Sequence, residues 1–383
     1  MKILSLIPVL ALSTASTLAQ DLPAEGKTVE DTPAVHPKKD TRPGIAPDIR
    51  EDDSKLKAQH GNFVAVPIPF SNPTLDSGLV AGAAYFYPQS PEEKKIEPAS
   101  VTALGAMYSS NDSKALGLAQ QNYWRGKWRF TGMAVAADLR LSLLAPDETS
   151  SGESVDWNIK GEIFYVKLAR KIKGHWYGGL LARYIDADQT IAASVEDPTF
   201  DLTAHLRSVG AGLYAEYDTR DMPLNSYTGQ HLTINALFND DALGSDYTYQ
   251  SYSASFMSYH TLSKSVVLGW QLKGCQRAGK TPLWEACRVG LRGFSATDYM
   301  GKVTASGQAE ARWHLSERWG AVAFAGVGYV GSSYNGIREN EPIPSYGVGV
   351  RFTVLKAKRI NIRVDYARSS DSDAVILSVG EAF

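Results

Sequence analysis

The sequence predicts an all-β fold: a closed antiparallel transmembrane β-barrel of about sixteen strands, with one long external loop folded inward. Three observations predict it. Short segments that alternate apolar and polar residues follow one another from residue 61 to residue 383. The links between these segments are alternately short and long. The last segment ends on an aromatic residue, Phe383.

The first sixty residues predict that the protein is exported, and they are not part of the predicted barrel. Residues 1–19 resemble a secretory signal peptide: Met1-Lys2 precede an apolar stretch and then small residues up to Ala19. Residues 20–60 are rich in Pro, Lys, Asp and Glu and show no period, which predicts a disordered periplasmic leader. We interpret this leader as a solvated spacer, with a partner-binding tail as the alternative. Residues 61–383 form the predicted barrel.

Composition limits the kind of membrane protein. After the signal peptide no stretch reaches the roughly 18 uninterrupted apolar residues of a spanning helix, so any span must be a strand. Mean hydropathy is −0.22, and the net charge of −2 gives no reason to expect a nucleic-acid partner. Gly 33, Tyr 19 and Trp 8 suit a barrel with aromatic girdles, although a secreted β-sandwich shares part of this profile.

Two segments show the alternation most clearly. In residues 359–366 the charged and amide side chains predict the inner face, and the apolar ones predict the lipid face. The inner set is Arg359, Asn361, Arg363 and Asp365, and the outer set is Ile360, Ile362, Val364 and Tyr366. Residues 306–314 repeat this pattern with Gln308, Glu310, Arg312 and His314 inside. Charges on one face of a spanning strand require a wet lumen.

Link lengths support the same fold, because outer-membrane barrels have short periplasmic turns and longer external loops. The short links are 125–127, 173–175, 262–264, 316–318 and 356–358, and the long links are 147–155, 187–203, 240–247, 279–302 and 332–342. One link, 88–99, is long where the count predicts a short turn. A sandwich gives no reason for such alternation.

The last strand predicts a C-terminal barrel signal. Val375, Leu377, Val379 and Phe383 share one face, which only Glu381 interrupts. The small and polar residues Ser378, Gly380 and Ala382 occupy the opposite face, which we expect to point into the barrel.

Two short motifs stand at predicted strand ends. The first is Asp218, Arg220, Asp221 and Pro223, followed by Gly229, in which an arginine lies between carboxylates that can accept charge-assisted hydrogen bonds. An ordinary charged turn would explain this motif equally well. The second is Leu291-Arg292-Gly293-Phe294, in the longest external link. Taken alone, the second motif is most simply an exposed arginine in a flexible loop.

With residues 66–79, these motifs resemble the BamA/TamA-type outer-membrane assembly-factor superfamily, also called the bacterial surface antigen barrel. The resemblance covers residues 61–383 and implies that Arg292 points into the lumen. By the alternation, its first expected partner is Glu310, beside Arg312, and its second is Asp365. The chain departs from the family at Gly326, where members commonly carry an aspartate, and its leader has no polypeptide-transport-associated domain.

The resemblance implies a monomeric barrel in the outer membrane of a Gram-negative bacterium, in contact with outer-membrane lipids. It would assist insertion, assembly or translocation of outer-membrane components through a weakly paired seam between first and last strands. Pro67, Pro69 and Pro73 cannot donate ladder hydrogen bonds, which fits a frayed seam. Partners would be client outer-membrane proteins or a periplasmic protein. The alternative is a passive channel, or a structural barrel that partners a separate periplasmic protein.

The two cysteines, Cys275 and Cys287, predict a disulfide, because an even pair in an exported protein normally forms one. Two free thiols are the alternative. Gly326-Val327-Gly328-Tyr329-Val330-Gly331 fits a dinucleotide motif, but it lies in an alternating strand with no helix after it. With scattered histidines and no nucleophile or metal motif, the sequence predicts no enzyme, no cofactor and no metal site.

Overall fold

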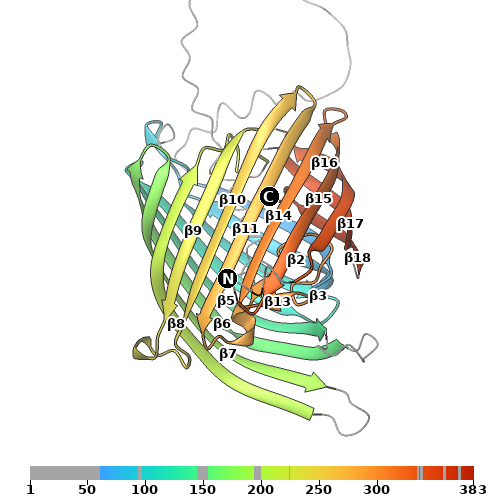
Figure 1. Cartoon of the computed structure of the whole chain (residues 1–383). Helices are drawn as coiled ribbons and strands as arrows, with labels where there is room; N and C mark the ends of the chain where they lie inside the picture. The colour runs from blue at the N-terminus through green and yellow to red at the C-terminus, as the bar shows by residue number, and fades with distance from the viewer. Residues whose placement is uncertain are drawn as a thin grey trace, which may run out of the picture.

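The computed structural model shows a closed antiparallel barrel of sixteen strands, which confirms the predicted fold class (Figure 1). The structure describes residues 61–93, 97–144, 154–193, 200–223, 225–333, 336, 340–356, 359–369 and 372–383. The predicted signal peptide and leader, residues 1–60, lie outside the described residues. Among the described residues, no helix is long and apolar enough to cross a membrane.

The wall consists of the following strands, in chain order: β1 (Asn62–Asn72), β2 (Asp76–Phe86), β3 (Val101–Ser109), β4 (Lys114–Trp124), β5 (Trp128–Leu144), β6 (Ser154–Lys173), β7 (Trp176–Ala193), β8 (Phe200–Asp218), β9 (Gly229–Asn239), β10 (Tyr249–Ser263), β11 (Val266–Gly279), β14 (Val303–His314), β15 (Trp319–Gly331), β16 (Ile343–Leu355), β17 (Ile360–Ser369) and β18 (Asp373–Val379). Each strand pairs with its neighbours in sequence, and β1 pairs with β18 to close the barrel. The small strands β12 (Cys287–Arg288) and β13 (Met300–Gly301) pair with each other inside the link between β11 and β14.

The two ends of the barrel differ in their links. At the turn end, short links such as 125–127, 174–175 and 264–265 join the strands. At the loop end, links such as 240–248 and 280–302 are longer, and β7 and β8 project beyond their neighbours (Figure 1). The long link 87–100 between β2 and β3 lies at the turn end, as the count predicts, so its length is an exception to the alternation.

The charged inner wall follows the sequence pattern on β14 and β17. Glu310 and Asp365 are 1% and 0% exposed, whereas Val364 and Tyr366 on the opposite face are exposed. The predicted faces of these strands are confirmed. Such alternation fits a spanning strand with a polar interior and an apolar exterior.

The inner face is not polar everywhere, and the expectation of a wet lumen along the whole wall was wrong. On β6, Phe164, Val166 and Leu168 are exposed on the outer face, but nearer the loop end the polarity reverses. There Trp157 is buried on the inner face, and the outer face carries a row of aligned polar residues. This row contains Glu162, Asp186 and Arg207 on β6, β7 and β8. The loop end therefore has an apolar core inside a polar shell, like a soluble protein.

Strands β1, β2 and β3 are apolar on both faces. The inner face of β1 carries Val64, Val66, Ile68 and Phe70, and its outer face begins at the exposed Phe63. Val80 and Met107 continue the inner face on β2 and β3 and pack with Ile68 in one buried apolar cluster. The same cluster contains Leu139, Leu141 and Trp157 from the loop end of β5 and β6.

The chain end corrects the prediction for the last strand. Val375 is exposed on the outer face, but β18 ends at Val379 and Gly380 has a φ of +88°. At this left-handed residue the chain leaves the line of the strand. Phe383 then lies inside, with its ring centroid 6.3 Å from that of Tyr259, and Arg312 Nη2 donates a 2.8 Å hydrogen bond to Phe383 O. Placing Phe383 on the lipid face was wrong.

The apolar core of the loop end generates a test on one strand. Trp157→Ala should lower the free energy of unfolding by about 3–5 kcal/mol, because it leaves a cavity in the core. The measurement is denaturant unfolding in detergent, followed by fluorescence. The matched control is Phe164→Ala, which removes a ring that is 48% exposed on the outer face and should cost less. Equal costs would contradict the reversal of polarity.

Candidate functional site

The link 280–302 folds into the barrel and forms the candidate site. It contains the short 3-10 helix η3 (Leu283–Glu285) and the two small strands β12 and β13. A disulfide joins Cys287 of β12 to Cys275 of β11, with Cα atoms 5.6 Å apart. The covalent bond holds the start of this link, which we call the plug loop, against the wall.

Arg292 at the centre of the plug loop is 7% exposed and contacts two wall acids. Its Nη2 lies 2.7 Å from Glu310 Oε2, and its Nη1 lies 3.2 Å from Asp365 Oδ2. These are the two partners expected from the sequence. The guanidinium also lies 3.4 Å from the ring centroid of Phe324, in cation–π geometry. The arginine thereby connects β14, β15 and β17 through one side chain.

The two acids belong to a larger buried network. Asp365 also accepts hydrogen bonds from Arg351 at 2.5 Å and Arg363 at 2.8 Å, while Glu310 contacts Arg312 at 2.6 Å. Glu381, in the tail after β18, accepts a 2.8 Å hydrogen bond from Arg351. Its inward position also corrects the assignment of Glu381 to the lipid face. The network joins the plug loop, the wall and the tail, and pairs its three acids with four arginines in a buried environment.

Glycines of the wall make room for the plug loop. A Cβ at Gly326 would lie 2.9 Å from Leu291 Cδ2, and one at Gly328 would lie 2.3 Å from Val289 Cγ1. Gly293 has a φ of +93°, which favours glycine. Gly326 stands where the superfamily that the sequence resembles commonly has an aspartate. Here Leu291 lies against the wall at that position, and Arg292 contacts Phe324 of the same strand instead. Phe294 is buried and stacks edge-on against Tyr299.

A second anchor of the plug loop was missed by sequence reasoning. Glu285 of η3 is 2% exposed, and its Oε1 lies 2.7 Å from Arg183 Nη1 of β7. Arg277 of β11 donates a 2.7 Å hydrogen bond to the carbonyl oxygen of Glu285. Arg183 and Arg277 lie on the inner faces of their strands, and such buried cations require an acid. The need of these two arginines for an acid could have been inferred from the sequence. It would not have identified Glu285 as that acid.

The turn motif lies at the turn end, between β8 and β9. Arg220 donates hydrogen bonds to both carboxylate oxygens of Asp218, at 3.0 and 2.8 Å. Pro223 accepts a third from the same guanidinium at 3.3 Å. A Cβ at Gly229 would lie 2.2 Å from Thr219 O, so only glycine fits there. The motif thus fixes the shape of its own link.

The same link reaches across the turn end to β17 and β14. Arg359 Nη1 lies 2.6 Å from Asp221 Oδ2. Burial raises the pKa of Asp221, but the hydrogen bonds from Arg359 and from the amides of Tyr227 and Thr228 lower that pKa below its ordinary value. Arg312 donates a 3.1 Å hydrogen bond to Ser226 O. The turn motif and the plug-loop network therefore meet at Arg312.

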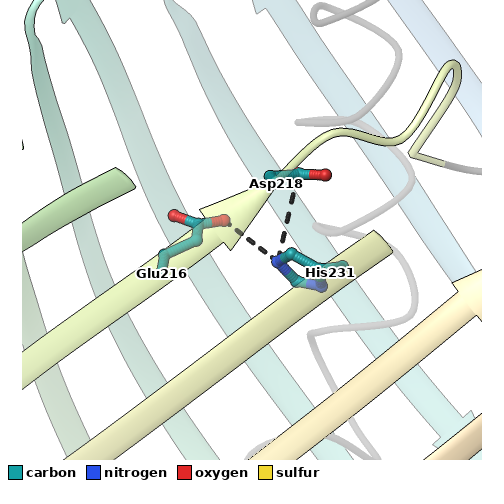
Figure 2. Close-up of side chains that lie close together, drawn as sticks. All are labelled: Glu216, Asp218 and His231. Carbon is teal, nitrogen blue, oxygen red and sulfur yellow. Dashed lines mark hydrogen bonds and ion pairs between the residues drawn. The ribbon is translucent and has the colours of Figure 1, made fainter. Parts of the chain in front are cut away.

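Three side chains beside the turn motif resemble a metal site. Glu216 and Asp218 on β8 point toward His231 on β9, as Figure 2 shows. His231 Nε2 lies 3.0 Å from Glu216 and 4.0 Å from Asp218. However, Arg129 lies 3.3 Å from Glu216 and Arg220 binds Asp218 with two nitrogens. A divalent cation would have to displace both arginines, so this donor set does not fit a resident metal.

Comparisons with known proteins show likeness in fold. No family model matches the sequence, and no curated protein matches it. The structure of BamA from Haemophilus ducreyi lacking POTRA domains 1–3 superposes with a TM-score of 0.59 at 11% identity, over 84% of this chain and 70% of that chain. CdiB from Acinetobacter baumannii gives 0.54 at 11% identity, over 84% and 59%. CdiB from Escherichia coli gives 0.54 at 13% identity, over 83% and 62%. The chain thus spans less than two thirds of either CdiB chain.

The Arg292 network generates the first test of the site. Arg292→Ala should raise single-barrel conductance in planar bilayers, because it removes the contacts that hold the plug loop to β14 and β17. Breaking such buried pairs costs about 3–5 kcal/mol. The matched control is Arg207→Ala, an exposed arginine on the outer face that pairs with Asp186. Unchanged conductance in a folded Arg292→Ala barrel would contradict the anchoring role.

The disulfide generates a second test. Replacing Cys275 and Cys287 with serine should lower the free energy of unfolding by about 3 kcal/mol, because a closed loop of this length restricts the unfolded chain. Denaturant titration in detergent measures the change. Reductant should have no further effect on the double variant. An unfolding midpoint equal to that of the oxidised parent would show that the bridge adds no stability.

Proposed function

We propose that this chain is an outer-membrane barrel that assists insertion, assembly or translocation of other outer-membrane components. The observation that carries the proposal is the weak seam between β1 and β18. Only Ser71 and Leu377 form a paired position there, whereas β1 and β2 share eleven paired positions and β17 and β18 share seven. A poorly paired strand edge is where another strand can add to a sheet.

The composition of β1 supports an edge that opens. Pro67 and Pro69 lack a backbone N–H, so they cannot complete a hydrogen-bond ladder with a neighbouring strand. The inward turn at Gly380 removes residues 381–383 from the line of β18 and shortens the surface available to β1. The prolines weaken pairing with β18, and the inward turn leaves other main-chain groups of β1 with which a client strand could pair.

The membrane location rests on the apolar outer face and on the fold. Exposed Leu, Val, Phe, Tyr and Trp side chains lie on the outer faces of many strands, as expected for strands that face lipid. BamA and CdiB, with which the fold is shared, support the outer membrane as the location.

We further propose that the barrel acts as a monomer in contact with outer-membrane lipids, and that client barrels or a periplasmic protein are its partners.

The anchored plug loop distinguishes this function from that of a passive channel. Arg292 and Glu285 fix the loop at two places on the wall, and Trp284 and Leu283 pack into the apolar cluster of the loop end. A loop held in this way occupies lumen that a constitutive pore would keep open. We therefore favour an assembly role over the passive channel.

A covalent lock tests the seam. Ser71→Cys with Leu377→Cys joins the paired positions of β1 and β18. In oxidised form this variant should lose the ability of the purified protein to speed folding of a model barrel into liposomes. Reduction should restore that activity.

The matched control joins β16 to β17 through Val350→Cys and Val364→Cys, which are also paired and lie on the outer face. This lock should leave activity unchanged. Full activity of the oxidised seam variant would contradict a mechanism that uses the seam.

A further inference from the structure

A cavity of about 260 Å³ lies between the plug loop and the seam. Residues of β1 and of β18 both contribute to its wall, including Ile68, Phe70, Ile376 and Ser378. Arg288, Leu291 and Arg292 of the plug loop form another side. Ser71 and Leu377, the paired position of the seam, also line the cavity, so the cavity extends to the seam.

The cavity is lined by cations. Lys273, Arg288, Arg292 and Arg363 contribute to its wall, and no aspartate or glutamate is found among its described lining residues. Two of these cations have ion-pair partners outside the lining: Arg292 pairs with Glu310 and Asp365, and Arg363 pairs with Asp365, which Arg351 also shares. Because the cations outnumber these shared acids, the cavity side of the guanidinium groups has a positive potential.

Arg288 has the least compensated charge of this set. The residue is 6% exposed, and its Nη1 donates a 3.2 Å hydrogen bond to Trp284 O. Its Nε and Nη2 have no hydrogen-bond partner among the described residues. Burial lowers its pKa to about 10, with Glu285 opposing that shift. Since a buried guanidinium with no acid in direct contact is costly, the site favours an anion.

The opposite side of the cavity is apolar. Ile68, Phe70, Val80 and Ile376 line it, and Val64 and Val66 continue the apolar inner face of β1 toward the turn end. A small hydrophilic anion would leave this surface without a partner. A molecule with an anionic head and an apolar chain would satisfy both sides.

We propose that this cavity binds the phosphate headgroup of an anionic lipid that enters through the seam, with its acyl chain along the inner face of β1. Arg288 is the principal contact to the headgroup, and Arg363 is the second. The site would be occupied whether or not the barrel acts on client proteins, so it goes beyond the proposed assembly function. Lipid binding and the assembly function are measured by separate experiments, so one proposal can fail without the other.

The test uses the purified full chain in a non-ionic detergent and isothermal titration calorimetry. Dihexanoyl phosphatidic acid should bind, and dihexanoyl phosphatidylcholine and inorganic phosphate should bind at least about tenfold more weakly. Arg288→Gln should weaken binding of the acid by about tenfold or more. Ser378→Trp, which fills the cavity without removing a charge, should abolish binding. Retained heat-modifiable mobility on gels verifies that each variant is folded.

The matched control is Arg207→Gln, which removes an exposed arginine outside the cavity and should leave the affinity unchanged. Equal affinity of the parent and both cavity variants would overturn the site. Inorganic phosphate that binds as tightly as phosphatidic acid would overturn the lipid assignment. Displacement of the lipid by an acidic peptide at lower concentration would show that a polypeptide is the better occupant, and would also overturn it.

Discussion

The ion pairs of Arg292 with Glu310 and Asp365 are the interaction on which the interior depends. They join the middle of the plug loop to two strands in a buried environment, where an unpaired charge would be costly. Glu285 makes the reverse arrangement with Arg183, so the loop contributes a cation at one anchor and an anion at the other. Neither anchor can slide to the position of the other without placing like charges together. The loop therefore has one register against the wall.

This fixed loop explains the uneven polarity of the barrel. At the loop end, Trp284 and Leu283 supply apolar surface that covers the inner faces of β5 and β6, and the outer faces there are polar. Between the turn end and this core, the wall is apolar outside and charged inside on β14 and β17. β1 differs from both regions because it is apolar on both faces. A strand of that kind loses little when lipid or another strand replaces its neighbour.

The seam and the tail are coupled through Arg312. This side chain contacts Glu310 of the central network, Ser226 of the turn link and Phe383 of the tail. The tail position in turn removes the last residues from the edge that would pair with β1. The weak seam thus depends on contacts inside the lumen as well as on the prolines of β1. Changes at the plug loop are expected to reach the seam through this chain of contacts.

The sequence by itself determined the barrel, the strand count and the inner faces of β14 and β17 that carry Glu310 and Asp365, because alternation with period two is a local property of each strand. The direction of Arg292 toward these acids was implied by the resemblance alone. Only the tertiary structure decided the inward turn of Phe383, the Glu285 anchor and the apolar inner faces. The alternation of β18 would place Phe383 on the lipid face. The left-handed Gly380 ends the alternation before the chain reaches it. Glu285 and Arg183 are about a hundred residues apart, and no local pattern identifies such a pair. Which face of an apolar strand meets protein rather than lipid depends on what the rest of the chain places beside it.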